Sequence, residues 1–562
     1  MSPRLGDLVT LVLPLLAAGA TAQEAGTPDG TSLRQTVHWD ATDGSGRLWG
    51  GTVELVVPTR AQLASQAAIP APVTTLTQSL GASPANRVHL VFVGDGYTAA
   101  QLGQYAGQVS SIASTFFSKE PYTRYAPYFL VHRVDVASNQ SGVDHDPLQG
   151  IFKDTALDMG FWCNGIDRLL CVDVGKAYAF AANAPHVDLV AALANSTTYG
   201  GAGYPSADLA TGSAGNASSL EVIRHEFGHA LGNLADEYDY GGPTVYAGSE
   251  PGSPNSSKLA AAAMAAAQAK WWRWLGHADA AFDGTVSTFE GSSYSQQGVY
   301  RPTQNSLMRS LGRPFNLPSA EALVLEIYRF VGPIDASSDA GATYAGSETL
   351  SVTPIAPAGA PLSVQWFLNG APIPGATATT LPLAALDFQG CPATVSVRVR
   401  DETTMVRDEA ARAELMTETR SFSVVPPGPA PIASYCVAAP NSAGPGATIS
   451  AQGSSSLAAG DLELVVLGAP PSVSGLFFFG TAATQAPFGD GWRCAGGTLV
   501  RFPATQTNVF GDAQQPVDLG ALPAGATVQP GDVRYFQFWY RDVAAGGALT
   551  NASDGLSVRV CP

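Results

Sequence analysis

The chain has 562 residues, too many for one hydrophobic core, and its length predicts roughly three to four domains. It contains 60 glycines and 40 prolines but only 13% charged residues, which favours a loop-rich protein with much β-structure. The net charge of −17 argues against nucleic acid or an anionic membrane surface as the main partner.

The first 22 residues predict an export signal. Arg4 precedes an apolar run over residues 8–18, and residues 20–22 form an Ala-x-Ala cleavage site. This run is too short to span a membrane, and no later segment reaches the roughly 18 apolar residues required; a retained anchor is the alternative. Six cysteines suit an oxidising compartment, and Cys163 with Cys171 is the local pairing. We therefore expect a secreted or extracellular protein, free or associated with the cell surface.

Residues 23–87 predict an N-terminal extension or pro-region that carries a strand. Residues 52–57 alternate between polar and apolar side chains early in the segment, as in a strand. Pro70, Pro72 and Pro84 indicate a linker before the next domain. Whether this region is removed is left open.

Residues 88–332 predict an α/β domain. An apolar strand over 88–93, a helix over 99–118 and a second strand over 129–136 give a β-α-β order, which favours a partly parallel sheet. A third strand is expected over 185–190. His132, His145 and His186 are interpreted as structural residues.

The central motif of this domain is His225-Glu226-Phe227-Gly228-His229. Two histidines at positions i and i+4 lie on one face of a helix, so both imidazoles can bind one metal ion, and the glutamate beside them can act as general base. Ser218 and Glu221 predict a capping box at the helix start. An apolar face is expected from positions 223, 227, 230, 231 and 234.

The third ligand must follow a break in this helix, because a continuous helix would carry Asp236 roughly 10 Å along the axis from His229. Gly232 is the residue expected to take the left-handed conformation that ends the helix. Asp236 or Glu237 can then supply an oxygen ligand. We favour Asp236, with Glu237 as the alternative ligand or as a hydrogen-bond partner of a liganding histidine.

Two later segments of this domain carry aromatic residues. An alanine-rich helix over 258–270 runs into Trp271, Trp272 and Trp274, which we interpret as hydrophobic anchors rather than as a substrate wall. Tyr294 and Tyr300 are both candidates to stabilise an oxyanion, and the sequence does not choose between them.

The histidine motif and the segment 234–238 that follows it resemble the signature of the IgA-peptidase family of zinc metallopeptidases. Three further segments agree with the resemblance, at 91–98, 199–203 and 300–309, so that it covers roughly 88–332. It implies a metzincin-like catalytic domain with Met308 in the Met-turn beneath the metal. In metzincins at large the third ligand follows the second histidine by six residues, a position held here by Ala235, so the acidic pair lies one place later.

The remaining chain predicts two β-rich modules. Residues 336–426 contain an alternating segment, 362–368, that ends at Asn369-Gly370, a strong hairpin turn, and this region resembles an immunoglobulin-like β-sandwich. Residues 427–562 open in a proline-rich linker and resemble a C-terminal module found on many exported bacterial proteins. Surface attachment, sorting and carbohydrate binding are all open as its role.

The expected fold class is therefore a multidomain chain, with an α/β metzincin-like zinc peptidase domain followed by two β-sandwich-like modules. We expect a secreted endopeptidase with one catalytic Zn²⁺ that acts on proteins, such as host or environmental glycoproteins including immunoglobulin A. A zinc hydrolase of non-peptide amides and a surface adhesin with a vestigial peptidase domain are the alternatives, and the intact Glu226 argues against the adhesin.

Overall fold

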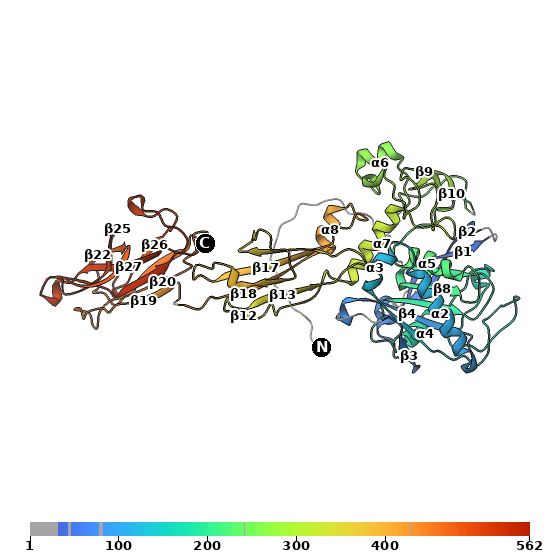
Figure 1. The fold of residues 1–562 in the computed structure, drawn as a ribbon, viewed down its shortest axis with the longest axis horizontal. Helices are drawn as coiled ribbons and strands as arrows, with labels where there is room; N and C mark the ends of the chain where they lie inside the picture. Colours follow the sequence, from blue (N-terminus) through green and yellow to red (C-terminus); the bar gives the residue numbers. More distant parts are fainter. Residues whose placement is uncertain (1–31, 43–45, 78–82, 241, 429) are drawn as a thin grey trace. The chain divides into compact units, whose positions relative to one another are not determined.

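The computed structural model describes residues 32–42, 46–77, 83–240, 242–428 and 430–562 (Figure 1). These residues fall into two compact units. The first contains the described residues up to 336 together with 354–363 and 399–418, and the second contains 337–353, 364–398 and 419–562. The predicted export signal lies outside the described residues. Over the described part of the chain, no helix has the length and apolar character needed to cross a membrane.

The first unit is built on an eight-stranded sheet with the order β2-β1-β7-β8-β6-β4-β5-β3. Its strands are β1 (Ser32–Thr42), β2 (Leu48–Pro58), β3 (Val73–Thr75), β4 (Val88–Asp95), β5 (Phe129–Val134), β6 (Leu189–Ala194), β7 (Gly201–Tyr204) and β8 (Leu209–Ser213). The four strands β8, β6, β4 and β5 run parallel to one another, which confirms the predicted partly parallel sheet. Every residue of β4 and β6 is buried, as the continuous apolar runs require.

The described part of the N-terminal segment joins the central sheet. Strands β1, β2 and β3 belong to the same sheet as the strands that follow residue 88, so the described part of 23–87 is not separate from this domain. The pairing that joins them is non-local, because β1 contacts β7 at His38 and Gly203. A sequence pattern reports the period of a strand but not its distant partner.

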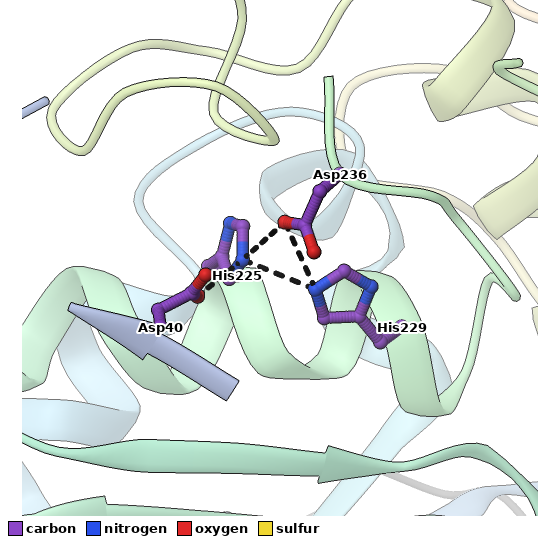
Figure 2. Close-up of side chains that lie close together, drawn as sticks. All are labelled: Asp40, His225, His229 and Asp236. Atoms are coloured by element: carbon purple, nitrogen blue, oxygen red, sulfur yellow. Dashed lines mark hydrogen bonds and ion pairs between the residues drawn. The ribbon is translucent and has the colours of Figure 1, made fainter. Parts of the chain in front are cut away.

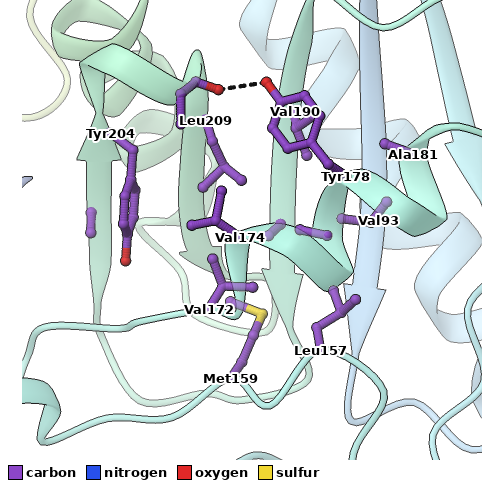
Figure 3. Close-up of a cluster of buried hydrophobic side chains, with 14 of the residues drawn as sticks. Val93, Leu157, Met159, Val172, Val174, Tyr178, Ala181, Val190, Tyr204 and Leu209 are labelled. Carbon is purple, nitrogen blue, oxygen red and sulfur yellow. Dashed lines mark hydrogen bonds between the residues drawn. The ribbon is translucent and has the colours of Figure 1, made fainter. Parts of the chain in front are cut away.

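Helices cover both faces of this sheet. The α-helices of the first unit are α1 (Arg60–Ala64), α2 (Leu102–Phe116), α3 (Tyr122–Tyr125), α4 (Val174–Ala181), α5 (Ser219–Ala230), α6 (Ala261–Ala267), α7 (Leu317–Phe330) and α8 (Glu409–Leu415). On one face, α4 buries Val174 and Tyr178 against Val93 and Val190 (Figure 3). On the other face, α5 packs closely on β7 and β8, where glycines leave room for its side chains. The sheet thus holds α5 in a fixed place.

A smaller β-hairpin and the alanine-rich segment complete this unit. Strands β9 (Phe289–Ser292) and β10 (Ser295–Arg301) pair with each other. The helix α6 is shorter than predicted because Gln268 takes a left-handed conformation that ends it. Trp271 and Trp274 are buried, and their indole N–H groups donate to Ser287 O and to a Glu321 carboxylate oxygen. Their burial agrees with a role as anchors.

The second unit is formed by β-sheets, among which short strands predominate. Its strands are β11 (Ile334–Ser337), β12 (Thr343–Tyr344), β13 (Thr349–Pro354), β14 (Ser363–Leu368), β15 (Ala371–Pro372), β16 (Thr380–Pro382), β17 (Ala393–Arg400), β18 (Thr417–Val424), β19 (Ile432–Tyr435), β20 (Thr448–Gln452), β21 (Leu462–Leu467), β22 (Ser474–Gly480), β23 (Ala482–Phe488), β24 (Gly491–Gly496), β25 (Val500–Gln506), β26 (Ala513–Val517), β27 (Val533–Arg541), β28 (Thr550–Ala552) and β29 (Gly555–Arg559). Of these, β11, β13, β14, β17 and β18 include residues assigned to the first unit. Strands β14 and β15 form a hairpin at Asn369-Gly370.

All six cysteines form disulfides. Cys163–Cys171 confirms the predicted local pairing in the first unit. In the second unit the bonds are Cys391–Cys561 and Cys436–Cys494. Cys391–Cys561 joins the two predicted β-modules covalently, which agrees with their grouping in one compact unit.

Candidate metal centre and active site

Helix α5 is buried on all sides rather than on one apolar face. Phe227 packs against Phe116 of α2 with ring centroids 5.7 Å apart, and Arg224 donates a hydrogen bond to Thr115 O at 2.8 Å. The predicted capping box is wrong: the Ser218 side chain makes no cap bond, and its backbone N–H donates instead to Asn216 Oδ1 at 2.9 Å. The helix start is therefore fixed by the preceding turn.

The end of α5 also differs from the prediction. Asn233, not Gly232, takes the left-handed conformation, with φ of 47°. The N–H of Asn233 bonds to His229 O at 3.1 Å, which is the single 5→1 bond of an αL cap, and the N–H of Leu234 bonds to Gly228 O at 3.0 Å. Gly232 is needed for space, because a Cβ there would lie 2.8 Å from Leu323 Cδ2. The chain turns back at this point, as the third ligand requires.

Four buried side chains converge beside α5: Asp40 from β1, His225 and His229 from α5, and Asp236 from the segment after it (Figure 2). The two Nε2 atoms lie 3.1 Å apart. Asp236 Oδ1 is 3.3 Å from His225 Nε2 and 3.4 Å from His229 Nε2. Asp40 Oδ2 is 2.6 Å from His225 Nε2.

The hydrogen bonds of the two imidazoles direct their lone pairs at this centre. His225 Nδ1 lies 3.0 Å from Leu307 O, and His229 Nδ1 lies 2.7 Å from Leu234 O, so each Nδ1–H donates to a carbonyl. Each Nε2 is then a lone-pair donor to a metal. Ligands held about 2.0–2.1 Å from one tetrahedral ion lie roughly 3.3 Å apart, which matches the observed nitrogen and Asp236 oxygen distances. The side chains therefore fit a metal ion.

Asp236 is held in place by the turn between β9 and β10. The backbone N–H of Ser293 donates to Asp236 O at 2.9 Å, and the Tyr294 hydroxyl donates to Asp236 Oδ2 at 2.5 Å. Burial alone would raise the pKa of Asp236, but His229, His225 and His38 outweigh it and hold the pKa well below its usual range. The carboxylate is thus ionised at neutral pH, as a metal ligand must be.

Glu237 faces a different set of partners. Its carboxylate accepts hydrogen bonds from Asn255 Nδ2 at 2.9 Å, from Asn316 Nδ2 at 2.7 Å and from Ser306 Oγ at 2.7 Å. No described contact joins it to His225 or His229. Its role in the structure is to tie three separate segments together beneath the cluster.

Met308 lies directly under α5. A Cβ on Gly228, between the two histidines, would lie 2.6 Å from Met308 Sδ, so the glycine lets the sulfur reach the helix backbone. Two backbone carbonyls of this segment accept hydrogen bonds from residues of the site. Leu307 O accepts from His225 Nδ1, and Met308 O accepts from Glu237 N at 2.7 Å. The segment thus supports both ends of the cluster.

Glu226 is fully buried, and no donor among the described residues reaches either of its carboxylate oxygens. Burial and the nearby Asp40 raise the pKa of Glu226 well above its ordinary value. Strand β7 runs alongside it. A Cβ on Gly201 would lie 3.0 Å from Glu226 Oε1, and one on Gly203 would lie 3.1 Å from Oε2. The glycines therefore leave space around a carboxylate that is free to exchange a proton.

The structure separates the other candidates. The Tyr294 hydroxyl donates a hydrogen bond to Asp236 of the cluster. Tyr300 lies in β10 and its backbone pairs with that of Ser257. No described hydrogen bond joins the Tyr300 phenol to the cluster. His132 lies against His89 near the far edge of the sheet, and His145 Nδ1 accepts from Gly150 N at 2.9 Å. His186 lies 3.2 Å from Asp188. None of these three histidines joins the metal cluster found among the described residues.

Sequence analysis missed Asp40 and His38. His38 stacks on the His229 ring with centroids 4.0 Å apart, and its Nδ1 lies 3.0 Å from the Tyr294 hydroxyl. The only local signal is a histidine and an aspartate two positions apart in β1, which places both on one face of the strand. That signal is weak without the knowledge that β1 pairs beside α5.

A family of known proteins matches the part of the chain that carries most of this site. Residues 76–281 and 275–327 match the family described as IgA peptidase M64. A search of the curated proteins gives no match. The matched ranges contain α5, the Asp236 segment, Tyr294 and Met308. Over these residues the chain is similar to the IgA peptidase M64 family, and this match indicates a metallopeptidase, an enzyme that hydrolyses peptide bonds.

Proposed function

We propose that this protein is a secreted zinc-dependent endopeptidase whose metal is held by His225, His229 and Asp236 and whose general base is Glu226. The observation that carries the proposal is the convergence of two Nε2 lone pairs and one ionised carboxylate oxygen within 3.1–3.4 Å of one another. Among the described residues Asp236 Oδ1 has no hydrogen-bond partner, and a cation is what holds such an oxygen beside two imidazole nitrogens stably.

The donor set favours zinc. Two neutral imidazoles and one carboxylate are a ligand combination used by catalytic zinc sites, which keep a further position for water or substrate. When bound, the ion acidifies water and stabilises negative charge that develops on a carbonyl oxygen.

The chain's own residues supply the proton transfers. Glu226 accepts a proton from the attacking water and donates it to the leaving amine. Burial raises the pKa of this carboxyl, which favours its holding the proton between the two steps. Tyr294 is the better placed of the two tyrosines to donate a hydrogen bond to the oxyanion, since its hydroxyl already reaches Asp236. Met308 supports the helix below both histidines.

The finer fold and setting are part of the same proposal. The helix, the turn-back at Asn233 and the methionine beneath them support a metzincin-like domain, and the sheets of the second unit support two β-sandwich-like modules. The six paired cysteines support an extracellular location. The family description makes immunoglobulin A the first protein substrate to test, among other glycoproteins.

A digest of a peptide library by the purified, zinc-loaded full chain tests this proposal. We expect internal cleavage products, one zinc per chain, and a loss of at least roughly 10²-fold in turnover for Glu226→Gln with the zinc content unchanged. Hydrolysis of non-peptide amides without peptide products would reject the endopeptidase, and near-normal rates for Glu226→Gln would assign the base to another group.

A further inference from the structure

The β1–β2 hairpin inserts two side chains into the proposed catalytic centre. Asp40 is 1% exposed; its Oδ2 lies 2.6 Å from His225 Nε2, and its Oδ1 accepts a hydrogen bond from Tyr238 at 2.8 Å. The partner of Asp40 across the hairpin is Gly50, whose missing side chain leaves room for the Tyr238 hydroxyl. Asp40 is therefore seated in a pocket that fits it.

The number of protein ligands decides whether a zinc site is open to water or closed. Structural zinc sites have four protein ligands and are closed, whereas catalytic sites have three and keep one position for water or substrate. His225, His229 and Asp236 provide three ligand atoms, and Asp40 makes a fourth within the same 4.8 Å cluster. With Asp40 in place the site has the ligand count of a closed site.

The hairpin also covers the strand edge beside Glu226. Strand β7 pairs with β8 on one side and with β1 on the other, at His38 and Gly203. An extended peptide binds a sheet by adding a strand to a free edge. Because Gly201 and Gly203 of β7 lie against Glu226, β1 lies where a substrate strand would reach the general base.

The two strands of the hairpin pair with each other far more extensively than the hairpin pairs with the rest of the sheet. β1 and β2 pair with each other at all eleven positions from Ser32 and Pro58 to Thr42 and Leu48, whereas β1 pairs with β7 at one position. After α1, residues 67–70 are exposed. Exposed segments of this kind are preferred sites of proteolytic cleavage.

We propose that the β1–β2 hairpin, residues 32–58, holds the peptidase in a latent state in which Asp40 occupies the metal position that catalysis needs and β1 occupies the substrate edge of β7. Activation removes the hairpin by hydrolysis of one peptide bond in the exposed stretch that follows α1. This cleavage consumes one water and leaves a carboxylate on the hairpin fragment and an amine on the rest of the chain, with a peptidase, this one or another, as catalyst. The inference rests on the proposed function of the site.

The first test compares Asp40→Ala with Glu54→Ala in the intact, zinc-loaded full chain. Both variants remove one carboxylate from the hairpin, but Glu54 is exposed on β2. The open form of a two-state protein is typically populated at about 0.1–10%. Asp40→Ala frees the metal position but leaves β1 on the edge of β7. It should therefore hydrolyse short peptides that need no pairing with β7 about 10- to 1,000-fold faster than wild type without any cleavage. Glu54→Ala should behave as wild type.

Zinc affinity, measured by competition with a chelator, is the second readout. Loss of a direct ligand should weaken zinc binding in Asp40→Ala by at least the roughly 10–100-fold typical of an outer hydrogen-bond partner, and Glu54→Ala should leave it unchanged. Asp40→Asn, which keeps the size of the side chain, should repeat the gain in rate if Asp40→Ala fails to fold. A lower rate together with lost zinc in a folded Asp40 variant would make Asp40 a permanent ligand and overturn the latent state.

A nicking experiment tests the cleavage step. A recognition sequence for a site-specific protease is inserted after Ala67 in the full chain, and activity, zinc content and the release of the N-terminal fragment are followed during digestion. We expect the fragment to leave, the zinc to stay and peptide hydrolysis to rise. If the intact chain already hydrolyses peptides and nicking leaves its rate unchanged, the latent state is rejected but the proposed function is not. A hairpin-free chain that binds zinc but cleaves no peptide of the library would reject the proposed function itself.

Discussion

Two pairs of buried histidines in the first unit have ring nitrogens at almost the same distance but different chemistry. His89 Nδ1 lies 2.9 Å from His132 Nε2, and His225 Nε2 lies 3.1 Å from His229 Nε2. In the first pair the outer nitrogens lie 2.9 Å from Pro84 O and 3.0 Å from the Thr75 hydroxyl. That arrangement allows one continuous chain of hydrogen bonds from Thr75 through both rings to Pro84, and every nitrogen has a partner.

The second pair cannot form such a chain. Both of its Nδ1 atoms lie against carbonyl oxygens, so both Nε2 lone pairs face each other and two carboxylate oxygens. A short distance between histidines therefore does not define a metal site. The partners of the outer nitrogens decide the tautomers, and the tautomers decide whether a cation is required.

The largest effect expected from this comparison is on metal content. His225→Ala removes one Nε2 ligand and should lose the bound zinc and the peptidase activity with it, because a direct ligand should contribute more than the roughly 10–100-fold typical of an outer partner. His132→Ala, the matched change in the other pair, should keep close to one zinc per chain. Elemental analysis of both purified variants measures this, and equal zinc loss in the two would contradict the distinction.

The second prediction separates the two acidic residues after α5. Asp236→Ala should weaken zinc binding far more than Glu237→Gln, because Asp236 Oδ1 lies 3.3–3.4 Å from both Nε2 atoms while Glu237 bonds to Asn255, Asn316 and Ser306. Glu237→Gln should instead lower the unfolding temperature, since its amide group cannot accept all three bonds. Chelator titration and thermal unfolding measure the two effects. The reverse order of affinities would make Glu237 the ligand.

The smallest effect concerns the non-metal pair. Burial, followed by the charge of His89, lowers the pKa of His132 to about 4, against 6.5 for an ordinary histidine. The unfolded chain therefore binds the proton more readily between these values, and this contribution to stability is lost as the pH falls below about 6.5. From pH 7 to pH 5 the loss should be about 2 kcal/mol.

His132→Gln provides the control for this pH dependence, because glutamine can accept from Thr75 and donate to His89 but does not titrate. Urea unfolding of the zinc-loaded wild type and variant at pH 7 and pH 5 measures the difference in their free energies of unfolding. Relative to the variant, the free energy of unfolding of the wild type should be lower at pH 5 than at pH 7. A difference that stays constant between the two pH values would show that His132 is not kept neutral by its surroundings.

Local features of the site could be predicted from the sequence. The spacing of His225 and His229 fixes both rings on one helix face, because helix geometry depends only on neighbouring residues. The β4-α2-β5 order and the Cys163–Cys171 bond are local in the same sense. The need for a break after the helix also followed from its rise per residue. The sequence motif thus determined which helix carries the proposed metal site.

The tertiary structure decided everything that depends on distant partners. It assigned the left-handed helix end to Asn233, because Gly232 is packed against Leu323. It brought Tyr294 rather than Tyr300 to the centre, because the β9–β10 turn bonds to the backbone of Asp236. Above all, it placed Asp40 at His225, almost two hundred positions away in sequence, through strand pairing between β1 and β7. Such pairing is set by sheet assembly and leaves no periodic signal in either strand alone.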